Sequence, residues 1–254
     1  MTKYCYFSGT GNSLWSAKKI AELVGGEYEL INIGIEVQKE KPVIEADAVV
    51  LLFPAYAYGA PVIVRKFTRK AVFKADYIAV FATVGSHPGG AMAEVYKILK
   101  RKKMNASYCG RIPAVENYIP IFGSPKPEKL ESRLRMQREA TEEAARCVME
   151  RRNNSINTFR PFSAFVSMLF FLATKIFFKW YRVTNECNGC GICEKLCPVS
   201  AITMRNNKPA FSKKCQHCQG CINWCPRRAI LFGTIKPNTV RYHHPEIGIA
   251  EISR

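Results

Sequence analysis

The chain has 254 residues, and 48% of them are hydrophobic, which is enough for one large core and a second, smaller one. Its 38 Lys and Arg residues against 20 Asp and Glu residues give a formal net charge of +18. The basic residues are dispersed along the chain and match no nucleic-acid-binding motif, which argues against nucleic acid as a partner.

Short apolar runs alternate with amphipathic stretches from residue 1 to about residue 115. The apolar runs are the expected strands, at residues 4–7, 28–33, 48–53, 77–83 and 108–113. The amphipathic stretches are the expected helices, at residues 12–23, 61–71 and 90–103. This alternation predicts an α/β fold with a doubly wound parallel sheet. In such sheets a ligand binds in the crevice beyond the carboxyl ends of the strands.

The segment between the first expected strand and the first expected helix combines hydroxyl groups, glycines and the free N–H groups of a helix start. It consists of Ser8, Gly9, Thr10, Gly11, Asn12 and Ser13. Such a loop is typical of an anion site for a phosphate. It lacks both the lysine-containing phosphate loop and the G-x-G-x-x-G pattern, so a phosphomonoester fits better than a nucleoside triphosphate or a dinucleotide. The alternative is an ordinary turn with a hydroxyl cap.

Two further loops follow the third and fourth expected strands. The first loop is stiff and aromatic, with Pro54, Tyr56, Tyr58 and Gly59. The second loop is rich in glycine, with Thr83, Gly85, Ser86, Gly89 and Gly90. Because these loops lie at successive strand ends, we expect them to bracket a flat, phosphorylated ring system. Each tyrosine has an alternative role as a half-buried residue of a turn.

With these three loops, the amino-terminal part resembles a flavodoxin, whose FMN lies at this point of the sheet. The resemblance is specific at residues 8–13 and is one of position and character in the other two loops. It implies that residues 8–13 bind the FMN phosphate, and that the aromatic and glycine-rich loops border the two sides of the ring. We therefore expect a flavodoxin-like FMN-binding domain at residues 1–125.

Residues 126–182 are expected to form a helical connector, which begins with a long charged helix at residues 126–152. The segment 159–181 is apolar almost all round, but its uncharged run is shorter than the roughly 20 residues of a membrane span. We expect a buried helix that joins two domains. The alternative is a segment lying on a membrane, because basic residues flank it: Arg160, Lys175, Lys179 and Arg182.

Eight of the eleven cysteines form two copies of the run C-x2-C-x2-C-x3-C-P, offset by 28 residues. The copies are Cys187, Cys190, Cys193 and Cys197, and then Cys215, Cys218, Cys221 and Cys225. This spacing is the bacterial ferredoxin signature, and two copies predict two [4Fe–4S] clusters. In this pattern the fourth cysteine of each run ligates the other cluster. We expect a small α+β two-cluster domain at residues 183–235 and a polar tail at residues 236–254.

Zinc and disulfides are the alternatives for these cysteines. Zinc sites space two C-x2-C pairs farther apart, and disulfides need an oxidising compartment, for which the start of the chain shows no signal peptide. We therefore expect clusters, in a cytoplasmic protein. The remaining Cys5, Cys109 and Cys147 are isolated in the sequence and are expected to be small buried apolar residues.

The whole chain resembles the flavodoxin–ferredoxin fusion proteins of anaerobes. This resemblance implies an electron-transfer protein that relays electrons between FMN and two [4Fe–4S] clusters, to or from a redox partner. With these cofactors bound the net charge stays near +12, a rough sum from ordinary pKa values. That charge indicates an acidic partner protein or a peripheral contact with a membrane. The alternative is a flavin-dependent reductase of a small molecule, with His87 as its proton donor.

Overall fold

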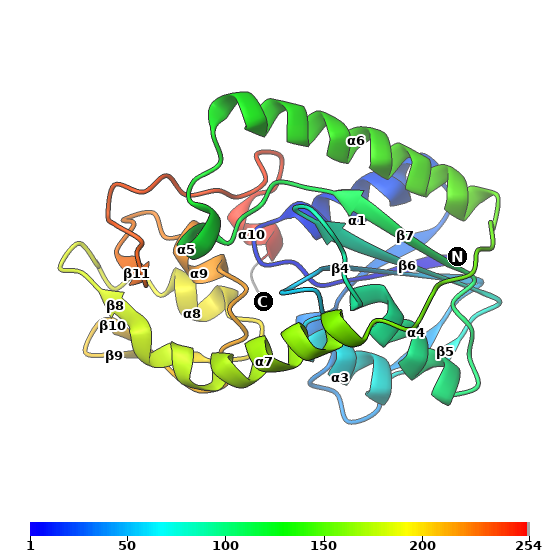
Figure 1. The fold of residues 1–254 in the computed structure, drawn as a ribbon, viewed down its shortest axis with the longest axis horizontal. Helices are drawn as coiled ribbons and strands as arrows, with labels where there is room; N and C mark the ends of the chain where they lie inside the picture. Colours follow the sequence, from blue (N-terminus) through cyan, green and yellow to red (C-terminus); the bar gives the residue numbers. More distant parts are fainter. Residues whose placement is uncertain (253–254) are drawn as a thin grey trace.

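The computed structural model describes residues 1–252, and its largest element is a five-stranded parallel sheet (Figure 1). The strands are β1 (Thr2–Tyr6), β2 (Tyr28–Asn32), β4 (Ala48–Pro54), β6 (Tyr77–Val84) and β7 (Tyr108–Pro113). Their order across the sheet is β2-β1-β4-β6-β7, and every neighbouring pair is parallel. Counted along the chain this order is 2-1-3-4-5, the flavodoxin-like doubly wound order. The expected fold class is confirmed.

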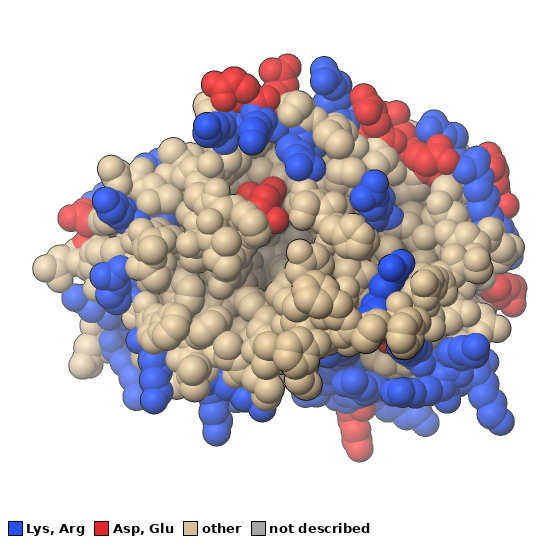
Figure 2. All heavy atoms as spheres, viewed as in Figure 1, with Lys and Arg blue, Asp and Glu red and all other residues tan. Residues whose placement is uncertain are grey.

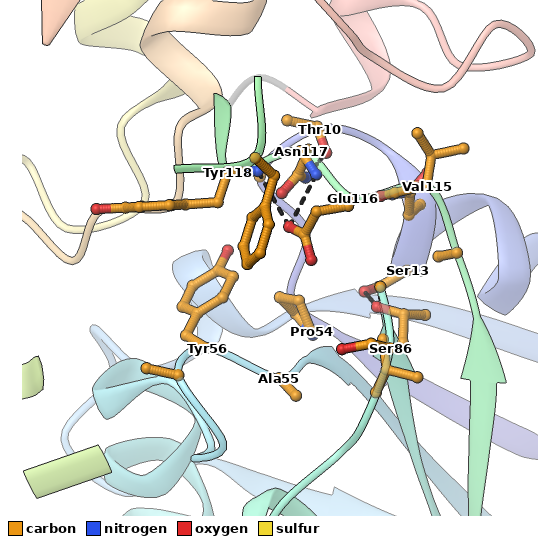
Figure 3. Close-up of a pocket in the computed structure, with 18 of the residues that line it drawn as sticks. Thr10, Ser13, Pro54, Ala55, Tyr56, Ser86, Val115, Glu116, Asn117 and Tyr118 are labelled. Atoms are coloured by element: carbon orange, nitrogen blue, oxygen red, sulfur yellow. Dashed lines mark hydrogen bonds between the residues drawn. The ribbon is translucent and has the colours of Figure 1, made fainter. Parts of the chain in front are cut away.

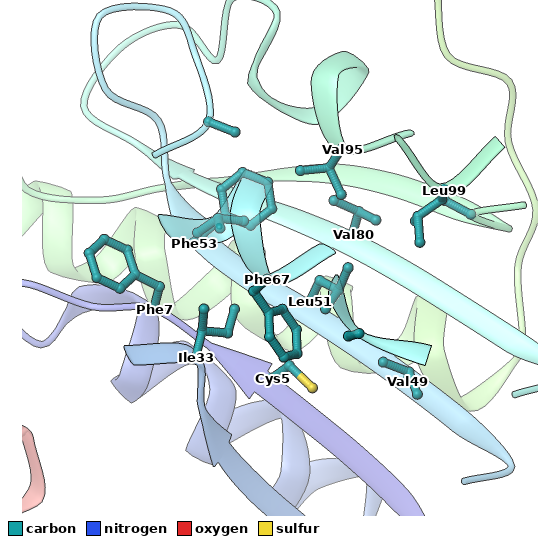
Figure 4. Close-up of a cluster of buried hydrophobic side chains, with 14 of the residues drawn as sticks. Cys5, Phe7, Ile33, Val49, Leu51, Phe53, Phe67, Val80, Val95 and Leu99 are labelled. Carbon is teal, nitrogen blue, oxygen red and sulfur yellow. The ribbon is translucent and has the colours of Figure 1, made fainter. Parts of the chain in front are cut away.

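One face of the sheet is covered by α3 (Val62–Lys70) and α4 (Ala91–Arg101). Leu51 and Phe53 of β4 point to this face and pack with Phe67 of α3, as Figure 4 shows. All three side chains are fully buried. Because side chains alternate along a strand, the residues between them in β4 face the opposite side, so the central strand reads as a continuous apolar run.

The other face is covered by α1 (Asn12–Val24) and α6 (Pro127–Met149). Ala144 and Val148 of α6 belong to the same hydrophobic core as Trp15 of α1. The helix was expected at residues 126–152, but as part of a connector, whereas the structure makes it the closing layer of the first domain. Its buried positions are mostly small or polar, so its composition indicates a solvated helix although one side of it is buried.

Small elements extend this domain. A short parallel pair, β3 (Val43–Glu45) with β5 (Val72–Lys74), and the one-turn helix α2 (Ile33–Glu36) lie beside the sheet. The sequence pattern did not predict these elements because they are only three or four residues long.

The carboxy-terminal domain contains two antiparallel strand pairs, β8 (Tyr181–Val183) with β11 (Ile230–Phe232), and β9 (Ile202–Arg205) with β10 (Lys208–Phe211). The short helices α8 (Ile192–Leu196) and α9 (Gly220–Asn223) begin 28 residues apart, which is the offset of the cysteine runs. A small core joins the two halves and includes Ile202 and Ile230, which are equivalent in the repeat. The expected small α+β domain is confirmed.

Two helices lie between the domains, α5 (Ile119–Phe122) and α7 (Pro161–Phe177), and α7 continues into the 3-10 turn η1 (Phe178–Trp180). In Figure 1, α7 runs across the front of the molecule toward the carboxy-terminal domain. The expectation that this helix is buried is wrong: Phe162 is 72% exposed and Ile176 is 56% exposed. The side chains that face the protein are Ser167, Phe171 and Thr174.

The tail returns to the first domain and ends in α10 (Ile249–Ile252). The backbone N–H of His244 donates to the carbonyl of Thr10 at 2.8 Å, and its ring stacks on Trp15 at a centroid distance of 4.7 Å. The hydroxyl of Tyr242 donates to the Asn12 side chain at 2.7 Å. The tail therefore packs on the start of α1, where its buried side chains add to the first domain.

His244 should make the stability depend on pH. Burial lowers its pKa from 6.5 to about 4, so its contribution is fully present above pH 6.5 and is lost as the pH falls toward 4. Between about pH 7 and pH 5 this group alone should reduce the free energy of unfolding by about 2 kcal/mol. His244→Phe keeps an aromatic ring beside Trp15 but does not titrate, so it should lose about 2 kcal/mol less over that interval.

Anaerobic denaturant titrations at both pH values measure this difference. His243→Phe, a change at the neighbouring exposed histidine, is the matched control. An equal loss in wild type and His244→Phe would contradict the prediction.

Candidate functional site

A cavity of about 270 Å³ lies at the carboxyl ends of the parallel strands. Figure 3 shows the side chains that reach it from the loops after β1, β4, β6 and β7. The residues of the three expected loops that line it are Ser8, Gly9, Thr10, Asn12, Ser13, Pro54, Tyr56, Tyr58, Thr83, Gly85 and Ser86. The structure therefore brings the three loops together around one space.

The first loop ends at the N-terminus of α1, which opens to the cavity. Gly11 is the N-cap, with φ of 98°, and no side chain caps the helix. Gly11 itself donates to the hydroxyl of Ser8 at 3.1 Å, whereas the N–H groups of a first helical turn have no partner within the helix. The positive end of the helix dipole adds to these donors. This corner fits the phosphate of a ligand.

The second loop is a tight turn in which Tyr56 and Gly59 exchange two backbone hydrogen bonds, both of 2.9 Å. Ala57 and Tyr58 at its tip have positive φ angles of 44° and 65°. This turn directs the Tyr56 ring into the cavity, and burial raises the pKa of the Tyr56 hydroxyl well above its usual value. The hydroxyl is therefore neutral at physiological pH.

Four expected residues are absent from the cavity lining, Gly11, Gly59, Gly89 and Gly90. A Cβ atom on Gly59 would lie 1.9 Å from the hydroxyl of Ser167 in α7, and one on Gly89 would lie 2.3 Å from the Cβ of Tyr58. The N–H of Gly90 donates to the carbonyl of Tyr58 at 2.7 Å. Gly59 and Gly89 therefore allow close packing behind the loops, because any larger residue would clash at these two positions.

A fourth loop, after β7, was not predicted. Glu116, Asn117 and Tyr118 line the cavity, and one oxygen of Glu116 accepts from the N–H groups of the next two residues at 3.0 and 3.1 Å (Figure 3). The Asn117 amide also donates to the hydroxyl of Thr10, which joins this loop to the first one. The position of these residues after the fifth strand was a signal that could have identified them.

The eight cysteines of the repeat form two sets of four. The outer set, Cys187, Cys190, Cys193 and Cys225, lines one small pocket. The inner set consists of Cys197, Cys215, Cys218 and Cys221. Burial raises the pKa of the last three thiols, and the proximity of Cys197 adds to the rise in each. Each set thus contains three cysteines of one run and the fourth cysteine of the other run. This is the grouping expected when the fourth cysteine of each run ligates the other cluster.

The environment of these thiols fits iron–sulfur ligation. Burial raises the pKa of Cys193 and of Cys218 to about 12, so a thiolate there needs the positive charge of a metal beside it. Backbone N–H groups point at the sulfurs: that of Ala201 donates to Cys197 Sγ at 3.1 Å. Within residues 1–252 no group of three or more His, Cys, Asp or Glu side chains is arranged to hold a single metal ion.

The cavity and the inner set share one loop. His217 lies between Cys215 and Cys218 and lines the cavity. It is 1% exposed, and its two ring nitrogens have no partner among the described residues. Burial lowers its pKa to about 4, so the ring is neutral at pH 7. A buried imidazole without a hydrogen-bond partner fits a cavity whose ligand supplies a donor or an acceptor to the ring.

The backbones of the first loop and of the inner cysteine loop are in contact. A Cβ atom on Gly9 would lie 2.4 Å from the carbonyl oxygen of Cys218, and one on Gly220 would lie 2.9 Å from the carbonyl oxygen of Gly9. That same Gly9 oxygen accepts from the Trp224 indole at 3.1 Å. The two domains therefore touch at the cavity itself.

Comparisons with known proteins find relatives for both parts of the chain. A family model described as "4Fe-4S binding domain" matches residues 181–203, which contain the first cysteine run. The "ferredoxin-like protein in nif region" of Sinorhizobium fredii (strain NBRC 101917 / NGR234) is 35% identical over 51 residues, which cover 17% of this chain and 80% of that protein.

Two solved structures are similar to part of the chain. The two-electron reduced flavodoxin of Megasphaera elsdenii is 18% identical, with a TM-score of 0.34, and the match covers 57% of this chain and 99% of that one. A flavone reductase is 14% identical, with a TM-score of 0.37, and the match covers 61% of this chain and 66% of that one. Because both scores are low, the fold is assigned from the strand order.

Gly9→Ala should destabilise the contact between the domains. The new methyl group would overlap the Cys218 carbonyl, and overpacking of this kind costs about 1–3 kcal/mol of unfolding free energy. Gly248→Ala is the control, because its Cβ would meet nothing closer than Glu251 at 3.6 Å, and it should change stability by less than about 0.5 kcal/mol. Anaerobic denaturation measures the free energy of unfolding of both variants. Equal values for Gly9→Ala and Gly248→Ala would contradict the contact.

Proposed function

We propose that this chain, a flavodoxin–ferredoxin fusion whose carboxy-terminal part belongs to the ferredoxin family, relays electrons between FMN and two [4Fe–4S] clusters. The electrons would pass to or from a redox partner protein. The observation that supports this relay most directly is the shared loop, in which His217 lines the cavity between two cysteines of the inner set. FMN exchanges one or two electrons and each cluster exchanges one, so the bound groups supply the redox chemistry.

The proposed FMN contacts follow from the cavity. The open N-terminus of α1 and the hydroxyls of Ser8 and Thr10 would hold the phosphate, and Tyr56 would border the ring system. The carboxylate of Glu116 lines the same space and disfavours further negative charge on a bound ring, which lowers its reduction potential. The chain thus both positions the ligand and biases its electron affinity.

The inner set is insulated from water by aromatic rings. Tyr181 stacks on Phe211 at a centroid distance of 4.3 Å, and Phe232 lies 4.9 Å from Tyr181. The hydroxyl of Tyr181 is 3.7 Å from the sulfur of Cys215. Exclusion of water favours a lower reduction potential, and hydrogen bonds to the sulfurs favour a higher one. These residues would therefore set the reduction potential of the inner cluster.

The outer set is the proposed contact point for the partner. Cys190 is exposed, so this pocket opens to the surface. Exposed basic side chains flank it in the sequence: Lys195, Arg205, Lys208, Arg227 and Arg228. The acidic Glu186 and Glu194 offset only part of this charge. A basic rim around a redox centre favours docking of an acidic redox protein, with an association rate that falls as salt rises.

The alternative, a reductase that acts on a small molecule over the flavin, has less support. His87 lines the cavity, but its Nδ1 accepts from the N–H of Gly89 at 2.9 Å. Glu116 is bound to two backbone N–H groups of its own loop. Both side chains therefore serve the loops that carry them, and we retain the electron relay as the function.

An anaerobic redox titration tests the relay. Reconstituted protein should contain about eight iron atoms per chain and one FMN, because two four-iron clusters are expected. Visible and electron paramagnetic resonance spectra should resolve a flavin and two clusters. Protein with full iron that does not bind added FMN would contradict the assignment of the cavity, and zinc in place of iron would contradict that of the cysteines.

Matched variants of the two sets test the order of the centres. Cys197→Ala removes a ligand of the inner set and Cys225→Ala the equivalent ligand of the outer set, so each should reduce the iron content from about eight to about four atoms. After partial reduction, flavin and remaining cluster should equilibrate rapidly in Cys225→Ala and much more slowly in Cys197→Ala. Equal rates in a rapid-mixing experiment would show that the inner set is not the one beside the flavin.

A further inference from the structure

The outer side of α7 carries a continuous apolar stripe. Its residues recur at alternating spacings of three and four, which places them on one side of a helix. They are Phe162, Phe165, Leu169, Leu172 and Ile176, and their exposed fractions run from 48% to 72%. A helix at the surface of a soluble protein normally turns such a stripe toward the core.

The inner side of α7 is the more polar one. Ser167 and Thr174 are buried against the protein, and of the large side chains on the helix only Phe171 is buried with them. The amphipathic pattern is therefore inverted with respect to the protein core. An exposed apolar surface of this extent marks an interaction site rather than a scattered set of apolar residues.

The apolar stripe continues onto neighbouring elements. Ile121 and Phe122 of α5 are 71% and 64% exposed, and Trp180 after α7 is 54% exposed. The ring of Tyr118, just before α5, lies 6.2 Å from that of Phe170 in α7, so the two helices adjoin. Figure 2 shows a broad tan area over this face, with an acidic group beside the hollow above it and basic residues gathered along its lower edge. We call the α7 stripe with Ile121, Phe122 and Trp180 the apolar face.

The charges in the segment that carries α7 have one sign. Residues 151–185 contain six basic residues and no acidic one. Three of them are exposed at and after the carboxy-terminal end of α7: Lys175 in α7, Lys179 in η1 and Arg182 in β8. Together with the net charge of +18, this pattern disfavours a second copy of the chain and favours a negatively charged apolar partner. A membrane with anionic lipids has that chemistry.

We propose that the apolar face docks the protein on the surface of a membrane that contains anionic lipids, with α7 lying in the plane of the interface. The helix is anchored to the protein on its other side, where Ser167 covers Gly59 and the Arg65 guanidinium lies 4.7 Å from the centre of the Phe171 ring. By length and composition Pro161–Trp180 is apolar enough to cross a membrane. Crossing would break these contacts and uncover the cavity, whereas docking on the surface keeps them.

Vesicle flotation of the cofactor-loaded full chain tests this proposal, which does not depend on electron transfer. The protein should bind vesicles of phosphatidylglycerol and phosphatidylcholine at least about tenfold more tightly than vesicles of phosphatidylcholine alone, since each basic residue near an anionic surface adds attraction. High salt should reduce this preference, and a carbonate wash should release the protein.

Two variants separate the apolar and the charged contributions. Phe165→Ser/Leu169→Ser/Leu172→Ser should weaken binding at least about tenfold on both kinds of vesicle. Its control changes exposed apolar residues outside the apolar face, Leu23→Ser/Ile35→Ser/Met149→Ser, and should bind like wild type. Lys175→Gln/Lys179→Gln should lose the preference for phosphatidylglycerol, and the control Lys97→Gln/Lys100→Gln should keep it.

Four outcomes of the vesicle experiments would overturn the proposal. They are no binding to either vesicle, equal binding to both, equal binding by the apolar variant and its control, and protein that resists the carbonate wash, which would indicate a spanning helix. Light scattering on the free protein provides the further check. A dimer that the apolar variant dissociates would assign the apolar face to a second copy and would equally overturn membrane docking.

Discussion

The direct contact between the loop after β1 and the loop of the inner cysteines determines the arrangement of the whole molecule. Gly9 can lie against the Cys218 carbonyl only because it has no side chain, and Trp224 fixes the approach with a hydrogen bond to the Gly9 carbonyl. This contact makes the two domains share one site. A gap or a solvated linker between them would separate the cavity from the cysteines.

The residues around that contact are buried and neutral. His217 and Tyr56 line the cavity, and burial shifts both pKa values toward the uncharged form. Apart from the Glu116 carboxylate, which lines the cavity, the charges of this basic protein are found mainly at its periphery, around the outer cysteines and beside the apolar face. Since a buried charge would be costly near groups that change their own charge, this separation leaves the interior free to accept electrons. The charged groups at the surface remain available for the recognition of partners.

The parts of the structure that follow from local pattern could be predicted from the sequence. The apolar run of β4 and the hydroxyl–glycine loop at residues 8–13 have few alternatives, and the spacing of the cysteines is itself a ligand geometry. The roles of α6 and α7 could not be read in this way. Ala144 buries little area and looks like a solvated residue, whereas Phe162 looks like a core residue but faces solvent. For both helices the tertiary surroundings decide which side chains are buried. Glu116 was not predicted as a cavity residue because the position of its loop is set by the sheet and not by the local sequence.

The tail adds a constraint on how the protein assembles. Tyr242 lines neither the cavity nor the pocket of the outer cysteines. Its hydroxyl donates to the side chain of Asn12 at 2.7 Å, and its backbone N–H donates to the side chain of Asn223 at 2.9 Å. One residue near the end of the chain thus bridges its beginning and its last cysteine loop. The junction between the two domains is therefore complete only when residue 242 is in place.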